Sequence, residues 1–179
     1  MKRKKKSELG VLLDYAGSYK CLTFLGLTLS AVSMLLSMAP YICIWLAARD
    51  LIAVAPEWTQ AQSVTRYGWM AFAFAVGGIV LYFAGLMCTH LAAFRTAENI
   101  RKQGVAHVMK APLGFFDSNA SGLIRSRLDA AAADTETLLA HNLADIVGTV
   151  VLFLSMLVLM FVFDWRMGAA GLLAAVISV

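Results

Sequence analysis

Long uninterrupted apolar runs constrain this chain more than any other feature. Three of them occupy residues 21–48, 67–94 and 147–163, and a shorter one, residues 167–179, ends the sequence. A helix that crosses the hydrocarbon layer needs about 20 apolar residues, and that layer tolerates only structures whose backbone hydrogen bonds are all made internally. The sequence therefore predicts an all-α, polytopic membrane helix bundle. Because the last run is short, we expect the chain to end inside a fourth span.

The positions of the basic residues predict how the spans are oriented. Six precede the first run, namely Lys2, Arg3, Lys4, Lys5, Lys6 and Lys20. Six more lie between the second and third runs, namely Arg95, Arg101, Lys102, Lys110, Arg125 and Arg127. The other connections hold only Arg49, Arg66 and Arg166. Since cytoplasmic loops are enriched in Lys and Arg, the N-terminus and the central stretch are expected in the cytoplasm, and Trp58 outside. A basic run beside a span sets orientation or touches anionic lipid, so no nucleic-acid partner is expected.

Residues 1–20 are predicted to form a cytoplasmic basic tail followed by an elbow helix in the membrane interface. Apolar side chains recur at helical spacing from Leu9 to Tyr19, as in a helix that lies in the plane of the interface. A secretory signal peptide is the rival interpretation of this end. The apolar run at 21–48 is too long for a signal peptide, and no small-residue cleavage site follows it.

The second and third spans are predicted to extend into a cytoplasmic loop that covers residues 95–146. No proline occurs between Tyr67 and Lys110, and a helix of that length would be about 65 Å long. The hydrocarbon layer takes only about 30 Å of it, so the rest must project into the cytoplasm, where Glu98 and Lys102 form an i,i+4 pair. The returning helix repeats every seven residues at Arg127, Asp134, His141 and Gly148.

A single tight break separates these two helices. Pro112 and Gly114 are expected to stop the first helix. The residues that favour helix starts come next: Asp117, Ser118, Asn119 and Ser121. Phe115 and Phe116 then lie in a water-facing turn, and exposed apolar pairs of this kind usually mark a docking surface. The alternative is an ordinary hairpin tip whose two rings pack internally.

The motifs around this break resemble those of a known family. They are P-L-G-F-F-D at residues 112–117, Gly122, S-R-L at 126–128 and the short D-W-R turn at 164–166. Together with the basic N-terminus and its elbow, they are similar to the transmembrane domain of ABC transporters of the exporter type. The chain departs from the family where many members have an N-D pair after S-R, because here Asp129 is followed by four alanines and Asp134. The resemblance implies that residues 21–179 are part of such a domain in a half-transporter.

The resemblance implies a permease that moves a substrate across the bacterial cytoplasmic membrane. ATP and Mg would be bound in a nucleotide-binding domain, and the other implied partners are the lipid bilayer and a second, identical or different half-transporter. Because no G-x-x-x-x-G-K-[ST] phosphate loop occurs in this sequence, the chain by itself is not expected to be an enzyme. Some relatives of this fold import siderophores, so both directions remain open. By resemblance, the residues that couple to the nucleotide-binding domain are Leu113, Phe115, Phe116, Asp117, Asn119 and Gly122.

Ionisable residues at the edges of the spans are the remaining candidates for a site. His90 lies near the cytoplasmic end of the second span, and His141 and Asp145 are i,i+4 neighbours. Such residues can mark a substrate pathway, although near the boundary they also simply reach headgroups or water. Pairs such as Arg125 and Asp129 are expected on a solvated helix face. The three cysteines show no spacing typical of a metal site or a disulfide framework, so no metal is expected.

Three alternatives to a working permease remain. A non-transporting membrane anchor would be a bundle without paired cytoplasmic extensions, and a truncated product would be inactive. An intramembrane enzyme would need catalytic pairs inside the spans, and the sequence offers no H-E-x-x-H motif or Ser/His/Asp set there.

Overall fold

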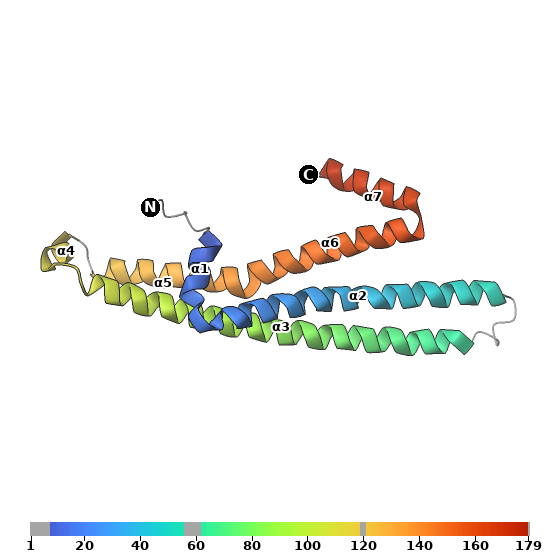
Figure 1. Cartoon of the computed structure of the whole chain (residues 1–179), viewed down its shortest axis with the longest axis horizontal. Helices are drawn as coiled ribbons and strands as arrows, with labels where there is room; N and C mark the ends of the chain where they lie inside the picture. Colours follow the sequence, from blue (N-terminus) through green and yellow to red (C-terminus); the bar gives the residue numbers. More distant parts are fainter. Residues whose placement is uncertain (1–7, 56–61, 119–120, 179) are drawn as a thin grey trace, which may run out of the picture. The chain divides into compact units, whose positions relative to one another are not determined.

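The computed structural model describes residues 8–55, 62–118 and 121–178, and every element in these ranges is a helix (Figure 1). In chain order the elements are α1 (Glu8–Ala16), η1 (Gly17–Tyr19), α2 (Lys20–Val54), α3 (Gln62–Val108), α4 (Leu113–Ser118), α5 (Ser121–Thr137), η3 (Leu138–Asn142), α6 (Leu143–Phe163) and α7 (Trp165–Ser178). The predicted all-α class is confirmed.

Three helical stretches are long and apolar enough to cross a membrane. They are Gly10–Val54, Ser63–Val108 and Ser121–Phe163. The helix that follows, α7, is apolar but shorter. The chain is thus a multi-pass membrane protein, with helices that continue well beyond the apolar runs on one side of the second and third spans.

The helices around the first connection are longer than predicted. We expected α2 to end near Ala48 and α3 to begin near Tyr67, but α2 continues to Val54 and α3 begins at Gln62. Arg49 therefore lies inside a helix, where its guanidinium stacks over the Trp45 ring at 5.2 Å. A charged side chain at a span end reaches water while its backbone stays helical, so charge alone did not mark the helix end. Trp58 lies outside the described residues.

Contacts divide the chain into two compact units. The first consists of Met1–Leu27 and Gly85–Asp145, and the second of Thr28–Ala84 and Ile146–Val179. The first contains the elbow and the polar extensions of the second and third helices, and the second contains most of the apolar spans.

In the first unit, the elbow is held on the polar, C-terminal part of α3. The Asn99 side chain donates a hydrogen bond of 3.0 Å to the Tyr15 carbonyl, and Ala16 is fully buried. The elbow helix is shorter than the predicted one because it ends at Ala16, where Gly17 takes a φ of 54°. Glycine adopts this left-handed backbone without steric cost, so the chain turns there into α2.

Within the same unit, the two extensions lie side by side. A methyl group on Gly104 of α3 would overlap the Leu128 side chain of α5, so the backbone of α3 approaches α5 closely at this point. An ion pair of 3.3 Å between Arg101 Nε and Asp129 Oδ1 joins the helices one turn away. On α3 itself, the predicted pair of Glu98 and Lys102 is present at 2.6 Å.

In the second unit, small residues let the apolar helices approach one another. A Cβ on Gly78 of α3 would lie 3.3 Å from Ser37 Oγ of α2, and one on Gly148 of α6 would lie 3.4 Å from Met34. Ser37 satisfies its hydroxyl by donating to the Ser33 carbonyl at 2.9 Å, as small polar residues do in membrane helices. Small residues thus allow α2 to approach both α3 and α6 closely in this unit.

The connection between the last two helices of the second unit is a single residue. Asp164 lies between α6 and α7, and its carboxylate accepts a hydrogen bond of 2.8 Å from the Arg166 backbone amide. A carboxylate in this place satisfies one of the amides that a helix start leaves without a partner. The very short turn predicted for D-W-R is confirmed.

Candidate functional site

The break between the long helices folds as a short helix of its own. After α3 ends at Val108, a turn leads to Pro112, whose carbonyl accepts a hydrogen bond of 2.9 Å from the Phe115 amide. Proline fits just before a helix because the first amides of a helix have no intrahelical acceptor to lose. The predicted break at Pro112 is thus confirmed, but Gly114 does not contribute to it, because it lies with Phe115 and Phe116 in helix α4.

The same finding changes the roles of the residues that follow. Asp117 and Ser118 were expected to start the returning helix, whereas they belong to the end of α4. The returning helix α5 begins at Ser121, and Gly122 lies in its first turn with open space around it. Asn119 lies outside the described residues. A break of this kind can be predicted from Pro112, but the length of the helix after it cannot.

Apolar side chains of α4 differ in how much they contact the rest of the chain. Leu113 is 87% exposed, while Phe115 and Phe116 are 37% and 38% exposed. The two rings meet edge to face with their centres 5.4 Å apart. The rings therefore shield each other in part, and Leu113 stands almost fully in solvent.

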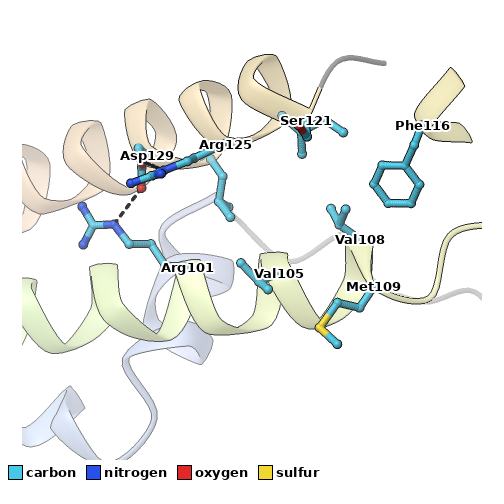
Figure 2. A pocket seen from close by; sticks show the side chains of 10 residues that line it. Arg101, Val105, Val108, Met109, Phe116, Ser121, Arg125 and Asp129 are labelled. Atoms are coloured by element: carbon cyan, nitrogen blue, oxygen red, sulfur yellow. Dashed lines mark ion pairs between the residues drawn. The ribbon is translucent and has the colours of Figure 1, made fainter. Parts of the chain in front are cut away.

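Phe116 also borders a groove between the two extensions. The groove has a volume of about 440 Å³ and is bordered, besides Phe116, by Arg101, Val105, Val108, Met109, Ser121, Ile124, Arg125, Leu128 and Asp129. Figure 2 shows Phe116 at one end, near Val108 and Met109, and the charged residues at the other. One of the two rings, that of Phe116, thus borders a groove within the hairpin.

The charged end of the groove is an ion-pair cluster on the surface. Asp129 Oδ2 lies 3.7 Å from Arg125 Nε on its own helix, as predicted from their i,i+4 spacing, and Oδ1 pairs with Arg101 of α3. All three side chains are between 42% and 87% exposed. Surface pairs of this kind contribute only about 0–1 kcal/mol each, so they add little to the stability of the two helices.

The structure brings together two histidines that the sequence places far apart. His90 of α3 and His141 of η3 contact each other with ring centres 4.6 Å apart and ring planes at 81°. Both histidines were predicted as candidates for a substrate pathway. Helical spacing could not predict their contact, because it relates only residues of the same helix. The predicted partner of His141 was Asp145. In the part of the chain that the structure describes, no hydrogen bond or ion pair joins these two residues.

The reason for this change of partner lies in the backbone. Residues 138–142 form a π-helix rather than an α-helix. A π turn takes up one extra residue, so residues before and after it do not keep the spacing of a uniform helix. The seven-residue repeat from Arg127 to Gly148 therefore does not describe one continuous face.

A second apolar cavity lies in the other unit. It has a volume of about 400 Å³ and is bordered by Met38, Tyr41, Ile42, Met156, Leu159, Met160 and Phe163. It holds no ionisable cluster, and no group of three or more potential metal ligands occurs anywhere in the described ranges. The chemistry that these residues offer is apolar packing.

Comparison with known proteins agrees with the family motifs. Residues 22–179 match the family described as ABC transporter transmembrane region. The chain is also similar to two proteins named mycobactin import ATP-binding/permease protein IrtA. The one from Mycolicibacterium smegmatis is 27% identical over 139 residues, which is 78% of this chain and 16% of that protein. The one from Mycobacterium tuberculosis is 28% identical over 138 residues, which is 77% of this chain and 16% of that protein. The chain thus spans about one sixth of these relatives' length.

Proposed function

Since this chain belongs to the family of ABC transporter transmembrane regions, we propose that it is the permease part of a transporter in the bacterial cytoplasmic membrane. ATP, with Mg²⁺, is hydrolysed in a nucleotide-binding domain that is not among these residues. The N-terminus lies in the cytoplasm, as the basic residues before the first span favour. A second half-transporter, identical or different, completes the pathway, and cross-linking of the intact protein in its membrane tests for that partner.

The single observation that carries this proposal is the exposed apolar surface of α4. Leu113 is 87% exposed, and in the orientation proposed above it lies in the cytoplasm, away from the membrane. Burying a side chain of this size against a partner contributes about 1.5–3 kcal/mol. A nucleotide-binding domain with an apolar groove would supply that partner, and α4 would serve as the coupling helix.

The chain on either side of α4 suits the transmission of movement. α3 is one unbroken helix from Gln62 to Val108, and α5, η3 and α6 continue without a break from Ser121 to Phe163. Packed helices pass a displacement along their axes rather than absorbing it. A shift of the nucleotide-binding domain would thus reach the spans through both neighbours of α4. The alternative of a non-transporting anchor is disfavoured, because it predicted a bundle without such paired extensions.

Truncation of α4 in the intact transporter tests the proposal. Phe115→Ala with Phe116→Ala should lower transport steeply, while membrane abundance and ATP binding stay near normal. Leu113→Ala is the sharper variant, because a side chain that is 87% exposed contributes little to folding of the chain itself. Ile52→Ala, which removes a 75% exposed apolar side chain from α2, is the matched control.

Abundance and transport must be measured on the same samples. If these side chains only pack within the hairpin, the double variant lowers abundance and the surviving molecules transport at the normal rate. Normal transport per molecule in Leu113→Ala and in the double variant would therefore reject the coupling role.

The direction of transport is a second question, and the names of the relatives favour import. Both are called mycobactin importers, so we propose that a siderophore-type molecule is carried inward. ATP-dependent binding of labelled mycobactin should be followed by its release on the cytoplasmic side in reconstituted vesicles. Movement of the label in the opposite sense would establish export instead, and leave the permease function intact.

A further inference from the structure

The Thr89 hydroxyl of α3 lies within hydrogen-bonding distance of two backbone carbonyls on different helices. Its oxygen is 2.9 Å from the Leu86 carbonyl oxygen of its own helix and 3.1 Å from the Ala140 carbonyl oxygen of η3. A hydroxyl has a single proton to donate, so Thr89 serves only one of the two carbonyls fully at a time. A bond to the preceding turn is the ordinary one for a helical threonine. The bond to η3 is therefore the feature that needs a reason.

The reason lies in the backbone of η3. There the Leu143 amide bonds to the Leu138 carbonyl, five residues back instead of four. Such a turn departs from the regular ladder of an α-helix, and hydroxyl side chains of neighbouring membrane helices satisfy backbone groups that irregular turns set free. The bond from Thr89 to Ala140 therefore favours the π turn over a regular α-helix in residues 138–142.

The surroundings keep water from replacing this hydroxyl. Thr89 is 0% exposed and Ala140 is 1% exposed, and Ala140 belongs to an apolar cluster with Ala93 and Leu139. Helix α2 lies against the threonine as well, because a Cβ on Gly26 would come within 2.6 Å of the Thr89 methyl group. A buried carbonyl that loses its donor is left at a cost in free energy, so the position of one proton affects which turn is stable.

We propose that Thr89 is the latch of a conformational switch in residues 138–142. With its proton on the Ala140 carbonyl, the segment is the π turn described above. With its proton on the Leu86 carbonyl, the segment closes to a regular α-helix. Both states contain the same number of residues, so the change turns α5 by about 100° about its axis relative to residues 143–145. The switch does not depend on the proposed function of the chain.

Two contacts between α5 and α3 belong to the latched state. The Leu128 side chain lies over Gly104, and Asp129 pairs with Arg101 at 3.3 Å. Both contacts require one particular side of α5 to face α3. A rotation of α5 by about 100° would separate both pairs, so the distance between probes on the two helices reports the state of the switch.

Pulsed electron paramagnetic resonance measures that distance in the intact protein. Spin labels are attached at Ala106→Cys of α3 and Ser126→Cys of α5, both exposed positions, in a background without native cysteines. Thr89→Val removes the hydroxyl and keeps the shape of the side chain. It should raise the population of a second distance at least about fivefold, as expected for the loss of one buried hydrogen bond. Thr89→Ser, which keeps the hydroxyl, should match the unaltered protein.

The same helix supplies a matched control. Thr96 is also 0% exposed, and its hydroxyl donates to the Ala92 carbonyl of its own helix at 2.7 Å. Thr96→Val should therefore leave the distance unchanged. An unchanged distance in Thr89→Val, or the same change in Thr96→Val, would overturn the switch.

A deletion keeps the test decisive if Thr89→Val alone does not fold. Deleting the exposed Asn142 removes the additional residue of the π turn, so the segment closes to an α-helix without turning α5. This shortened chain should show the original distance, and Thr89→Val should neither change that distance nor unfold the shortened chain, as circular dichroism checks. A new distance or loss of folding on adding Thr89→Val to the shortened chain would show that the hydroxyl does not act through the π turn, and would reject the proposal.

Discussion

The Leu128 side chain of α5 lies directly over Gly104 of α3, so a Cβ at that glycine would overlap it unless the leucine moved. We expect Gly104→Val to destabilise the first unit, because overpacking costs about 1–3 kcal/mol and exceeds the gain of about 0.5 kcal/mol in helix propensity. Thermal unfolding of the purified protein measures this. Gly68→Val is the matched control, since nothing lies within 4 Å of a Cβ at Gly68 of the same helix. Leu128→Ala should restore part of the loss, and equal stability of the two valine variants would contradict the close approach.

The elbow should loosen when its polar anchor is removed. Asn99→Ala takes away the hydrogen bond to the Tyr15 carbonyl, which contributes about 0.5–1.5 kcal/mol. Hydrogen exchange of the amides in α1 should speed up accordingly, while that of α5 stays the same. Gln103→Ala, an exposed change on the same helix, serves as the control. Unchanged exchange in α1 would show that packing of the buried Ala16 holds the elbow alone.

Glu98, which pairs with Arg95 and Lys102, makes folding stability depend on pH in a definite direction. The hydrogen bond from Lys102, followed by that from Arg95, holds the pKa of Glu98 below its ordinary value of 4.5. Because this pKa is lower in the folded state than in the unfolded state, the ionised Glu98 stabilises the fold above about pH 4.5. This stabilisation is lost as the pH falls through the pKa that Glu98 has in the folded protein. The exposure of the group keeps this contribution small.

Titration of the Glu98 carboxyl by nuclear magnetic resonance checks this directly. Lys102→Gln should raise the pKa of Glu98 toward 4.5, and high salt should do the same, because the partners are exposed. In the variant Glu98→Gln, the stability difference from the unaltered protein should vanish at low pH. A pKa of Glu98 that does not respond to Lys102→Gln would contradict the pairing.

The orientation of the spans is open to a labelling experiment. In a background without native cysteines, Trp58→Cys should react with an impermeant thiol reagent from outside intact cells. Asn119→Cys should react only after the membrane is permeabilised, since the flanking extensions contain the concentrated Lys and Arg residues. The reverse pattern would place the N-terminus outside and reject the proposed docking of α4 in the cytoplasm.

The features that depend on local sequence could be predicted, and those that depend on contacts between distant residues could not. The apolar runs predict the spans, Pro112 the break and Asp164 the short turn, because each acts through its immediate neighbours. The contact of His90 with His141 requires the packing of Thr89 against Ala140, which are 51 residues apart. Likewise, the i,i+4 rule paired His141 with Asp145 because it assumes a regular α-helix, whereas η3 is a π turn.

That π turn also bears on how chains of this kind can differ in length. Inserting one residue into a regular helix would rotate everything beyond it by about 100° and expose a different side of the following span to lipid. A wider turn absorbs the additional residue locally, so α6 keeps its lipid-facing side. Deleting one residue within 138–142 should therefore restore an ordinary helix without reorienting α6. We therefore expect a change in length by a single residue to be tolerated within 138–142 but not in the middle of α6.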